Sequence, residues 1–253
     1  MKKYFVDQNS IVRKIWGKAD TVLFIFAGAA AEFALNKAVD WLYFTGRLPA
    51  DPLARLFSTV EYAGRIIFSE QQNALAAIDR ITAIHQDVEK KRHDKIPDWA
   101  YRDVLYLLID YSIRSYELLE RKLAEEEKAE VFGVFLQVGN RMRLAGLPAD
   151  YRQWLRSRDQ HLAENLVKSE FTIDLYHQYK KHLGNTRYII LKQVQFQLTP
   201  SRVSSLLGLK NKYWLIPLLK LYKLFRAMKL DTPLKSALLP AAYKARILQL
   251  DIK

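Results

Sequence analysis

One histidine of this sequence lies where the neighbouring residue types suggest cofactor binding. His85 falls in a stretch of helical apolar spacing. The apolar positions of the stretch are Ala74, Ala77, Ile78, Ile81, Ala83, Ile84 and Val88. A histidine on such a face is either a core residue with satisfied hydrogen bonds or a ligand. Small neighbours such as Ala77 and Ala83 would let a flat macrocycle approach the helix, and a neutral imidazole binds iron.

A second helical face carries polar groups that suit the same chemistry. Arg55, Thr59 and Tyr62 follow each other at i, i+4 and i+7, so a helix would place them on one side. A buried arginine there could pair with a carboxylate such as a haem propionate. The simpler alternative is a surface ion pair for Arg55 and a hydroxyl bonded back to its own helix for Thr59.

Several other chemistries find no support in the sequence. It contains no cysteine, which excludes disulfides, zinc–cysteine sites and iron–sulfur clusters. No phosphate-binding glycine motif, Gly-x-Ser-x-Gly elbow, Glu-x-x-His pair or His-Glu-x-x-His helix occurs. No side chain can be assigned as a catalytic acid or base, so the catalytic residue stays unknown at this stage.

The elements that must position these residues are helices. The segments 46–52, 95–98, 146–150 and 199–201 carry the Gly, Pro and Asp residues typical of helix ends, and Asp98 is expected as an N-cap. Between them the apolar spacing is helical, as in Val104, Leu107, Leu108, Tyr111 and Leu118. We therefore predict an all-α fold. The expected division is a helical domain over residues 1–185 and a basic helical extension over residues 186–253.

The positive charge is concentrated in that extension. The chain carries 40 Lys or Arg and 27 Asp or Glu. Residues 185–253 hold thirteen of the bases and two of the acids, which gives this segment a net charge of +11. Such a segment suits an anionic membrane surface, a nucleic acid or an acidic partner, or is simply a solvated cationic face. Residues 212–230 mix Lys and Arg with Trp, Tyr, Leu and Phe, as interfacial helices do, and Pro217 should start or kink this helix.

The most apolar run is too short to cross a membrane. It covers the 11 residues 21–31, whereas a spanning helix needs about 20. We expect it to form a buried core helix in a soluble, cytoplasmic protein. Peripheral attachment to the inner face of the membrane through the basic segment is a further hypothesis.

The segment 55–88 resembles the MpaB/rubber-oxygenase family, which includes the polyisoprene-cleaving latex-clearing protein and the farnesyl-cleaving MpaB oxygenase. The family pattern is Arg-x-x-x-Thr followed by His-x-x-Val, matched here by Arg55, Thr59, His85 and Val88. The resemblance extends from about Thr21 to Leu162. It implies an all-helical, globin-related fold and an oxygenase with non-covalent haem b that uses O₂ on a hydrophobic, isoprenoid- or lipid-like substrate. It also implies that His85 is the proximal iron ligand and that Arg55 and Thr59 belong to the haem site.

The sequence departs from the family pattern at three places. Asn36-Lys37 stand where many members have His-Pro, and residues 107–109 stand where many have Trp-Val-His. The Gly that usually follows His-x-x-Val is replaced by Glu89 or Lys90. A non-enzymatic haem- or lipid-binding or sensing protein therefore remains the alternative, and a nucleic-acid-binding helical protein is less favoured. If the enzyme hypothesis holds, residues 23–33 and 106–116 are the expected lining of an apolar pocket.

Overall fold

The computed structural model describes residues 2–46, 50–210 and 215–228, and within them the chain forms eleven helices and no strand. The all-α prediction is confirmed, while the globin-related packing stays a prediction. The helices are α1 (Ile11–Trp16), α2 (Ala19–Phe33), α3 (Asp40–Phe44), α5 (Pro52–Phe68), α6 (Gln71–Arg92), α7 (Asp98–Leu119), α8 (Glu125–Arg141), α9 (Tyr151–Glu164), α10 (Glu170–Leu198), α11 (Ser201–Leu207) and α12 (Leu215–Ala227).

Helix α2 lies at the centre of the molecule and packs most extensively against α7. The contact is close because Gly28 has no side chain: a Cβ there would lie 2.2 Å from Cδ1 of Tyr111. Most side chains of α2 are buried, so the predicted core helix over residues 21–31 is confirmed. No helix in the described part of the chain is long and apolar enough to span a membrane.

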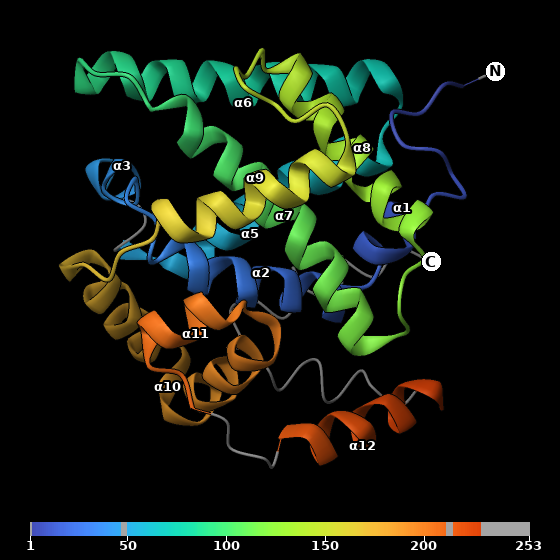
Figure 1. Cartoon of the computed structure of the whole chain (residues 1–253), viewed down its shortest axis with the longest axis vertical. Helices are drawn as coiled ribbons and strands as arrows, with labels where there is room; N and C mark the ends of the chain where they lie inside the picture. Colours follow the sequence, from blue (N-terminus) through green and yellow to red (C-terminus); the bar gives the residue numbers. More distant parts are fainter. Residues whose placement is uncertain (1, 47–49, 211–214, 229–253) are drawn as a thin grey trace.

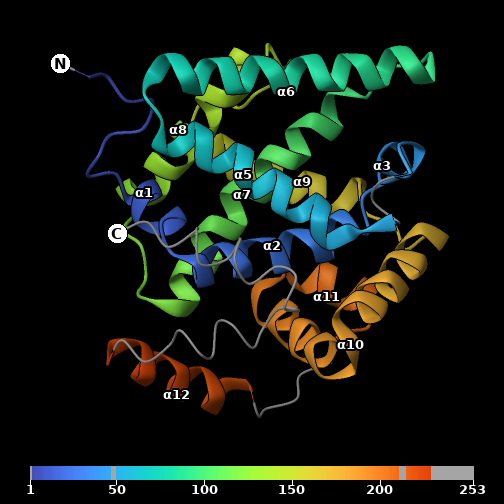
Figure 2. The same ribbon diagram turned by 180° about the vertical axis from the view of Figure 1, so that it is seen from behind.

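Helices α5 and α6 form a hairpin on one side of this core. They meet at Ser69 and Glu70 and separate toward the other end of α6, as Figures 1 and 2 show. Helix α3 lies near the wide end of the hairpin. There Arg92 of α6 donates to Asp40 at 2.6 Å, and its guanidinium lies 4.1 Å from the centre of the Trp41 ring.

The predicted helix ends agree with the structure at most positions. Asp150 caps α9 by accepting a hydrogen bond from the Gln153 amide at 2.7 Å, and α10 ends just before the predicted break at 199–201. The expectation for Asp98 was wrong by one residue, since α7 begins at Asp98 itself and Pro97 takes the cap position. Proline suits that place because its fixed φ and missing N–H disturb no helical hydrogen bond.

Two predicted apolar stripes need correction. Val104 is 41% exposed and Ile84 is 42% exposed, and Ala83 is also exposed. Ala83 lies about 200° around the helix from His85, so it cannot shape the side of the helix that carries the imidazole. The buried positions of this stripe are Ala74 and Ile78.

The C-terminal helices lie on the side opposite α6 (Figures 1 and 2). Helix α10 is bent back on itself at Gly184, whose φ of 72° and ψ of 171° are not helical. The predicted division between residues 185 and 186 falls beside this bend, and it stays a prediction. Of the predicted interfacial helix, residues 212–214 and 229–230 lie outside the described part, as do all later residues. Helix α12 begins at Leu215, with Pro217 in its first turn.

Candidate functional site

His85 lies on the side of α6 that faces the protein, in line with the buried Ile78. Its Nδ1 is 2.9 Å from the carbonyl oxygen of Ile81, one turn earlier. A carbonyl only accepts, so Nδ1 carries the proton and Nε2 keeps its lone pair. Burial lowers the pKa of His85, and the nearby positive charge of Arg55 lowers it further. The side chain is therefore a neutral imidazole with an available Nε2, the form that binds a metal.

The α5 residues predicted to share the site lie in the first half of that helix. Arg55 is half-buried, and its positive charge acts on His85, which lies on the other helix of the hairpin. Its Nη1 donates to Oγ of Ser58 at 3.3 Å. The hydroxyl of Thr59 donates to the carbonyl oxygen of Arg55 at 3.2 Å. This is the hydrogen bond back to its own helix that the simpler alternative predicts for Thr59. Arg55 and His85 thus lie on the two helices of the hairpin, with Thr59 one turn beyond Arg55.

Tyr101 of α7 occupies one side of the imidazole. The two rings meet edge to face with their centres 5.2 Å apart. The Tyr101 hydroxyl donates to Glu89 at 3.1 Å, and the same carboxylate accepts from the Ile96 amide. Burial and the charge of Glu89 raise the pKa of Tyr101 above its usual range, so the phenol stays protonated. Glu89 thereby fixes the position of the ring next to His85.

Of the two segments predicted to line an apolar pocket, one lines a cavity in the structure and the other is mostly buried in the core. Residues 23–30 do line a cavity of about 110 Å³, together with the first turn of α5 and residues from both halves of α10. Its walls are almost entirely apolar, apart from Tyr179 and Arg187. Residues 106–116 do not contribute to this cavity; most of them are buried in the core instead.

A buried ionic network next to α2 was not predicted. Arg158 of α9 donates to Glu32 of α2 at 2.6 Å and to Asp110 of α7 at 2.9 Å. Tyr111 donates to Glu32 at 2.8 Å, and His161 bridges Glu32 and Asp103. Arg158, Glu32, His161 and Asp103 are each less than 5% exposed. The network ties α2, α7 and α9 together where water is excluded.

The charges of this network hold each other in the ionised state. Burial opposes ionisation of Glu32, but Arg158 and His161 outweigh it and lower its pKa to about 2. Burial also opposes protonation of His161, yet hydrogen bonds to Asp103 and Glu32 raise its pKa above the usual value. Asn36 joins the same cluster by donating to Asp103 at 3.2 Å. The residue that replaces the His of the His-Pro pattern therefore has a structural partner here.

The family to which the chain belongs follows from a match over most of its length. The catalytic domain described as "ER-bound oxygenase mpaB/B'/Rubber oxygenase" matches residues 13–228. The chain is a member of this family. No curated protein and no solved structure gives a significant match. Within the described residues, no three His, Asp or Glu side chains gather in a way that could hold a metal ion.

The chemistry of the side chains around His85 fits a haem. A single neutral imidazole with Nε2 available is the donor that haem iron takes from a proximal histidine. Arg55 supplies a cation within electrostatic reach of that imidazole, as a carboxylate-bearing macrocycle requires.

Proposed function

We propose that this chain is a haem b-dependent oxygenase that acts on a hydrophobic, isoprenoid- or lipid-like substrate. The observation that carries the proposal is His85, whose Nδ1 is tied to the Ile81 carbonyl while Nε2 stays available. The resemblance of His85 and Val88 to the His-x-x-Val pattern supports the ligand role of His85, and the oxygenase family model matches residues 13–228.

Each residue of the site has a separate task in this proposal. His85 holds the iron through Nε2, and its bond to Ile81 fixes both the tautomer and the direction of the ring. Arg55 neutralises a propionate, and Thr59 stabilises the turn of α5 that carries Arg55. Bound haem supplies the iron that activates O₂. The protein contributes ligation, orientation and an apolar environment from which water is excluded.

The absorption spectrum of the purified protein tests the proposal. We expect the wild-type protein to take up hemin at a ratio of about one and to show a Soret band. His85→Ala should lose that band because it removes the ligand but leaves the rest of the hairpin intact.

The matched control is His93→Asn, at the exposed end of the same helix. His93 has a φ of 55°, a conformation that asparagine tolerates well, so this variant should keep the Soret band. A wild-type protein that takes up no hemin, or a His85→Ala variant with an unchanged spectrum, would overturn the assignment.

Haem or lipid binding without turnover is the second candidate function. It is favoured by Asn36, which is held in a structural cluster where many relatives have His-Pro. Oxygen uptake by the reduced, hemin-loaded protein in the presence of an isoprenoid separates the two. Uptake that depends on the isoprenoid supports the oxygenase, whereas stable O₂ or CO binding without consumption supports the binding protein.

We also propose that α12 attaches the protein to an anionic membrane surface. One side of α12 faces the protein through Leu215 and Leu219, and Tyr222 on the same side donates to Asp20 at 2.6 Å. The other side exposes Leu218, Leu221, Leu224 and Met228, each at least 44% exposed. Lys220 flanks this apolar strip, and α12 contains no acidic residue. A hydrophobic substrate would be collected from the same membrane.

A further inference from the structure

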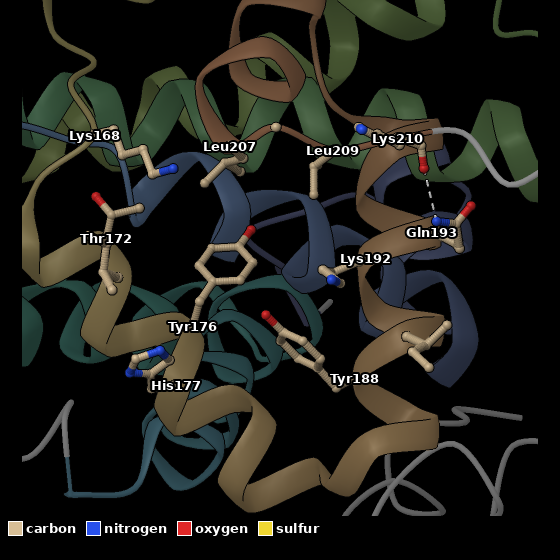
Figure 3. Close-up of a pocket in the computed structure, with 13 residues that line it drawn as sticks. Lys168, Thr172, Tyr176, His177, Tyr188, Lys192, Gln193, Leu207, Leu209 and Lys210 are labelled. Atoms are coloured by element: carbon tan, nitrogen blue, oxygen red, sulfur yellow. Dashed lines mark hydrogen bonds between the residues drawn. The ribbon is translucent and has the colours of Figure 1, made fainter.

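A cavity of about 380 Å³ lies far from His85, between the two halves of α10 (Figure 3). Because α10 bends back at Gly184, its two halves face each other, and the end of α11 with the following residues closes a third side. The rings of Tyr176 and Tyr188 extend into this space from opposite halves, with their centres 6.4 Å apart. The volume is within the range of small-molecule sites in proteins.

The lining of this cavity is basic. Lys168, Lys192 and Lys210 line the cavity from three different segments, and no acidic residue is among the thirteen that line it. Within the described part of the chain, none of the three lysines forms an ion pair with a carboxylate. In Figure 3 the side chains of Lys168 and Lys192 lie on opposite sides of the Tyr176 ring. The cavity therefore concentrates positive charge that no carboxylate of its lining neutralises.

Lys192 is held in place by an aromatic ring. Its Nζ lies 4.7 Å from the centre of the Tyr188 ring, a cation–π contact that fixes the ammonium group beside the cavity. An ammonium group that is already positioned loses less freedom when it binds an anion.

The same cavity has an apolar rim. Ile173 on the first half of α10 is 49% exposed, and Ile189 on the second half is 41% exposed. Both line the cavity, together with Leu207 and Leu209 from the closing segment. Large apolar side chains exposed beside a basic cavity indicate a ligand that carries both an anionic and an apolar part.

We propose that this cavity binds an amphipathic anion, a carboxylate or phosphate head joined to an apolar chain. The head pairs with Lys192 and Lys168, and the chain lies against Ile173 and Ile189. The volume corresponds to about a dozen water-sized units, which suits a head group and a chain of moderate length. The site involves none of the residues around His85, so it stands independently of haem binding.

Isothermal titration of the full chain tests this site with four probes below their micelle-forming concentrations. Dodecyl phosphate and dodecanoate carry both parts and differ in their head groups, whereas inorganic phosphate has only the head and dodecanol only the chain. We expect at least one of the two amphipathic anions to bind with one-to-one stoichiometry and more weakly as salt rises. Inorganic phosphate and dodecanol should each bind at least tenfold more weakly.

Substitutions connect the binding to this cavity. Lys192→Met should weaken binding of the amphipathic anion at least tenfold. Lys180→Met, an exposed lysine of the same helix that does not line the cavity, should leave it unchanged. The proposal is overturned if neither amphipathic anion binds, if inorganic phosphate binds as tightly as dodecyl phosphate, or if the two lysine variants behave alike. None of these outcomes depends on hemin uptake, so they are distinct from a failure of the oxygenase proposal.

Discussion

Arg158 is enclosed by carboxylates, Glu32 on one side and Asp110 on the other. Arg158→Met would keep much of the side-chain volume but leave Glu32 without the guanidinium that neutralises it. A buried charge that loses its partner is strongly unfavourable, so we expect the free energy of unfolding to fall by about 3–5 kcal/mol. Urea denaturation followed by circular dichroism measures this change.

Arg156, two residues earlier on α9, provides the matched control because it is exposed. Arg156→Met should change the free energy of unfolding by less than about 0.5 kcal/mol. Equal losses of unfolding free energy for the two variants would show that buried Arg158 contributes no more to stability than an exposed arginine does.

His161 should make stability depend on pH. Burial alone would lower its pKa, but Asp103 and Glu32 raise it above the unfolded value of about 6.5. Because the pKa of His161 is higher in the folded state than in the unfolded state, protonated His161 stabilises the native state, fully so below the unfolded pKa of about 6.5. The contribution is lost as pH rises through the folded pKa. We expect the difference in unfolding free energy between wild type and His161→Gln to shrink as pH rises above about 6.5.

His93→Gln serves as the reference for this pH series because His93 is exposed. If the difference for His161→Gln changes with pH no more than the difference for His93→Gln does, His161 is not protonated in the native network.

Among individual residues, the sequence predicts which helix faces carry the candidate haem-site residues, but it does not predict the buried ionic network. Helical spacing was sufficient to place Arg55 and Thr59 on one face and His85 on the inner face of its helix. It could not reveal the ionic network, because Glu32, Arg158 and His161 become neighbours only through the packing of α2 against α9. One signal was present: Asp103 and Asp110 lie seven residues apart, on the same side of α7 as the buried Leu107 and Tyr111. Acidic residues inside an apolar face indicate buried partners.

Among the elements, α10 depends on a single glycine for its bend. Gly184 combines a φ of 72° with a ψ of 171°, a region that residues with a Cβ adopt only under strain. We expect Gly184→Ala to lower the free energy of unfolding by about 1–3 kcal/mol. Thermal or urea denaturation measures it, and the loss arises from backbone conformation because an added Cβ would meet no atom within 4 Å.

Gly133 is a glycine whose replacement by alanine should stabilise the protein, in contrast to Gly184. It lies inside α8, where an added Cβ also meets nothing within 4 Å. Gly133→Ala should raise stability by about 0.5–1 kcal/mol, since alanine favours the helix. A Gly184→Ala variant as stable as wild type would contradict the proposed origin of the bend.

The helix ends were predictable where a residue type has a strict local role. Asp150 is followed by a helix because its carboxylate satisfies the amide of Gln153, and this interaction is entirely local. The bend in α10 was not predictable, because the apolar spacing continues on both sides of Gly184. A glycine within a helical pattern indicates either a weak helix or an end.

At the scale of the whole molecule, basic and apolar side chains occur together on α12, which exposes Leu218, Leu221 and Leu224 and carries Lys220, Lys223 and Arg226. Residues 185–253 have a net charge of +11, whereas residues 1–184 have +2. Arg226 pairs with Asp20 at 3.2 Å and with Glu120 at 2.7 Å, which anchors α12 to the body. The exposed leucines of α12 are therefore held in a fixed orientation on the helix that also carries Lys220 and Lys223.

This arrangement predicts binding to anionic vesicles. We expect the protein to sediment with phosphatidylglycerol-containing liposomes, and less so with neutral ones, because apolar insertion and attraction to anionic lipids act together. Leu221→Ser combined with Leu224→Ser should abolish sedimentation by removing the apolar strip. Lys220→Gln with Lys223→Gln should weaken it by about 2 kcal/mol, roughly thirtyfold, at about 1 kcal/mol for each lysine near the surface.

The control pair is Lys180→Gln with Lys181→Gln, two exposed lysines on the first half of α10. This pair removes the same charge from a surface without the apolar strip, so it should bind vesicles nearly as wild type does. If both lysine pairs weaken binding equally, net charge alone drives the attachment and α12 has no special role. If wild type fails to sediment with anionic vesicles at moderate salt, the membrane proposal is wrong, because the basic segment and the leucines together would then be insufficient.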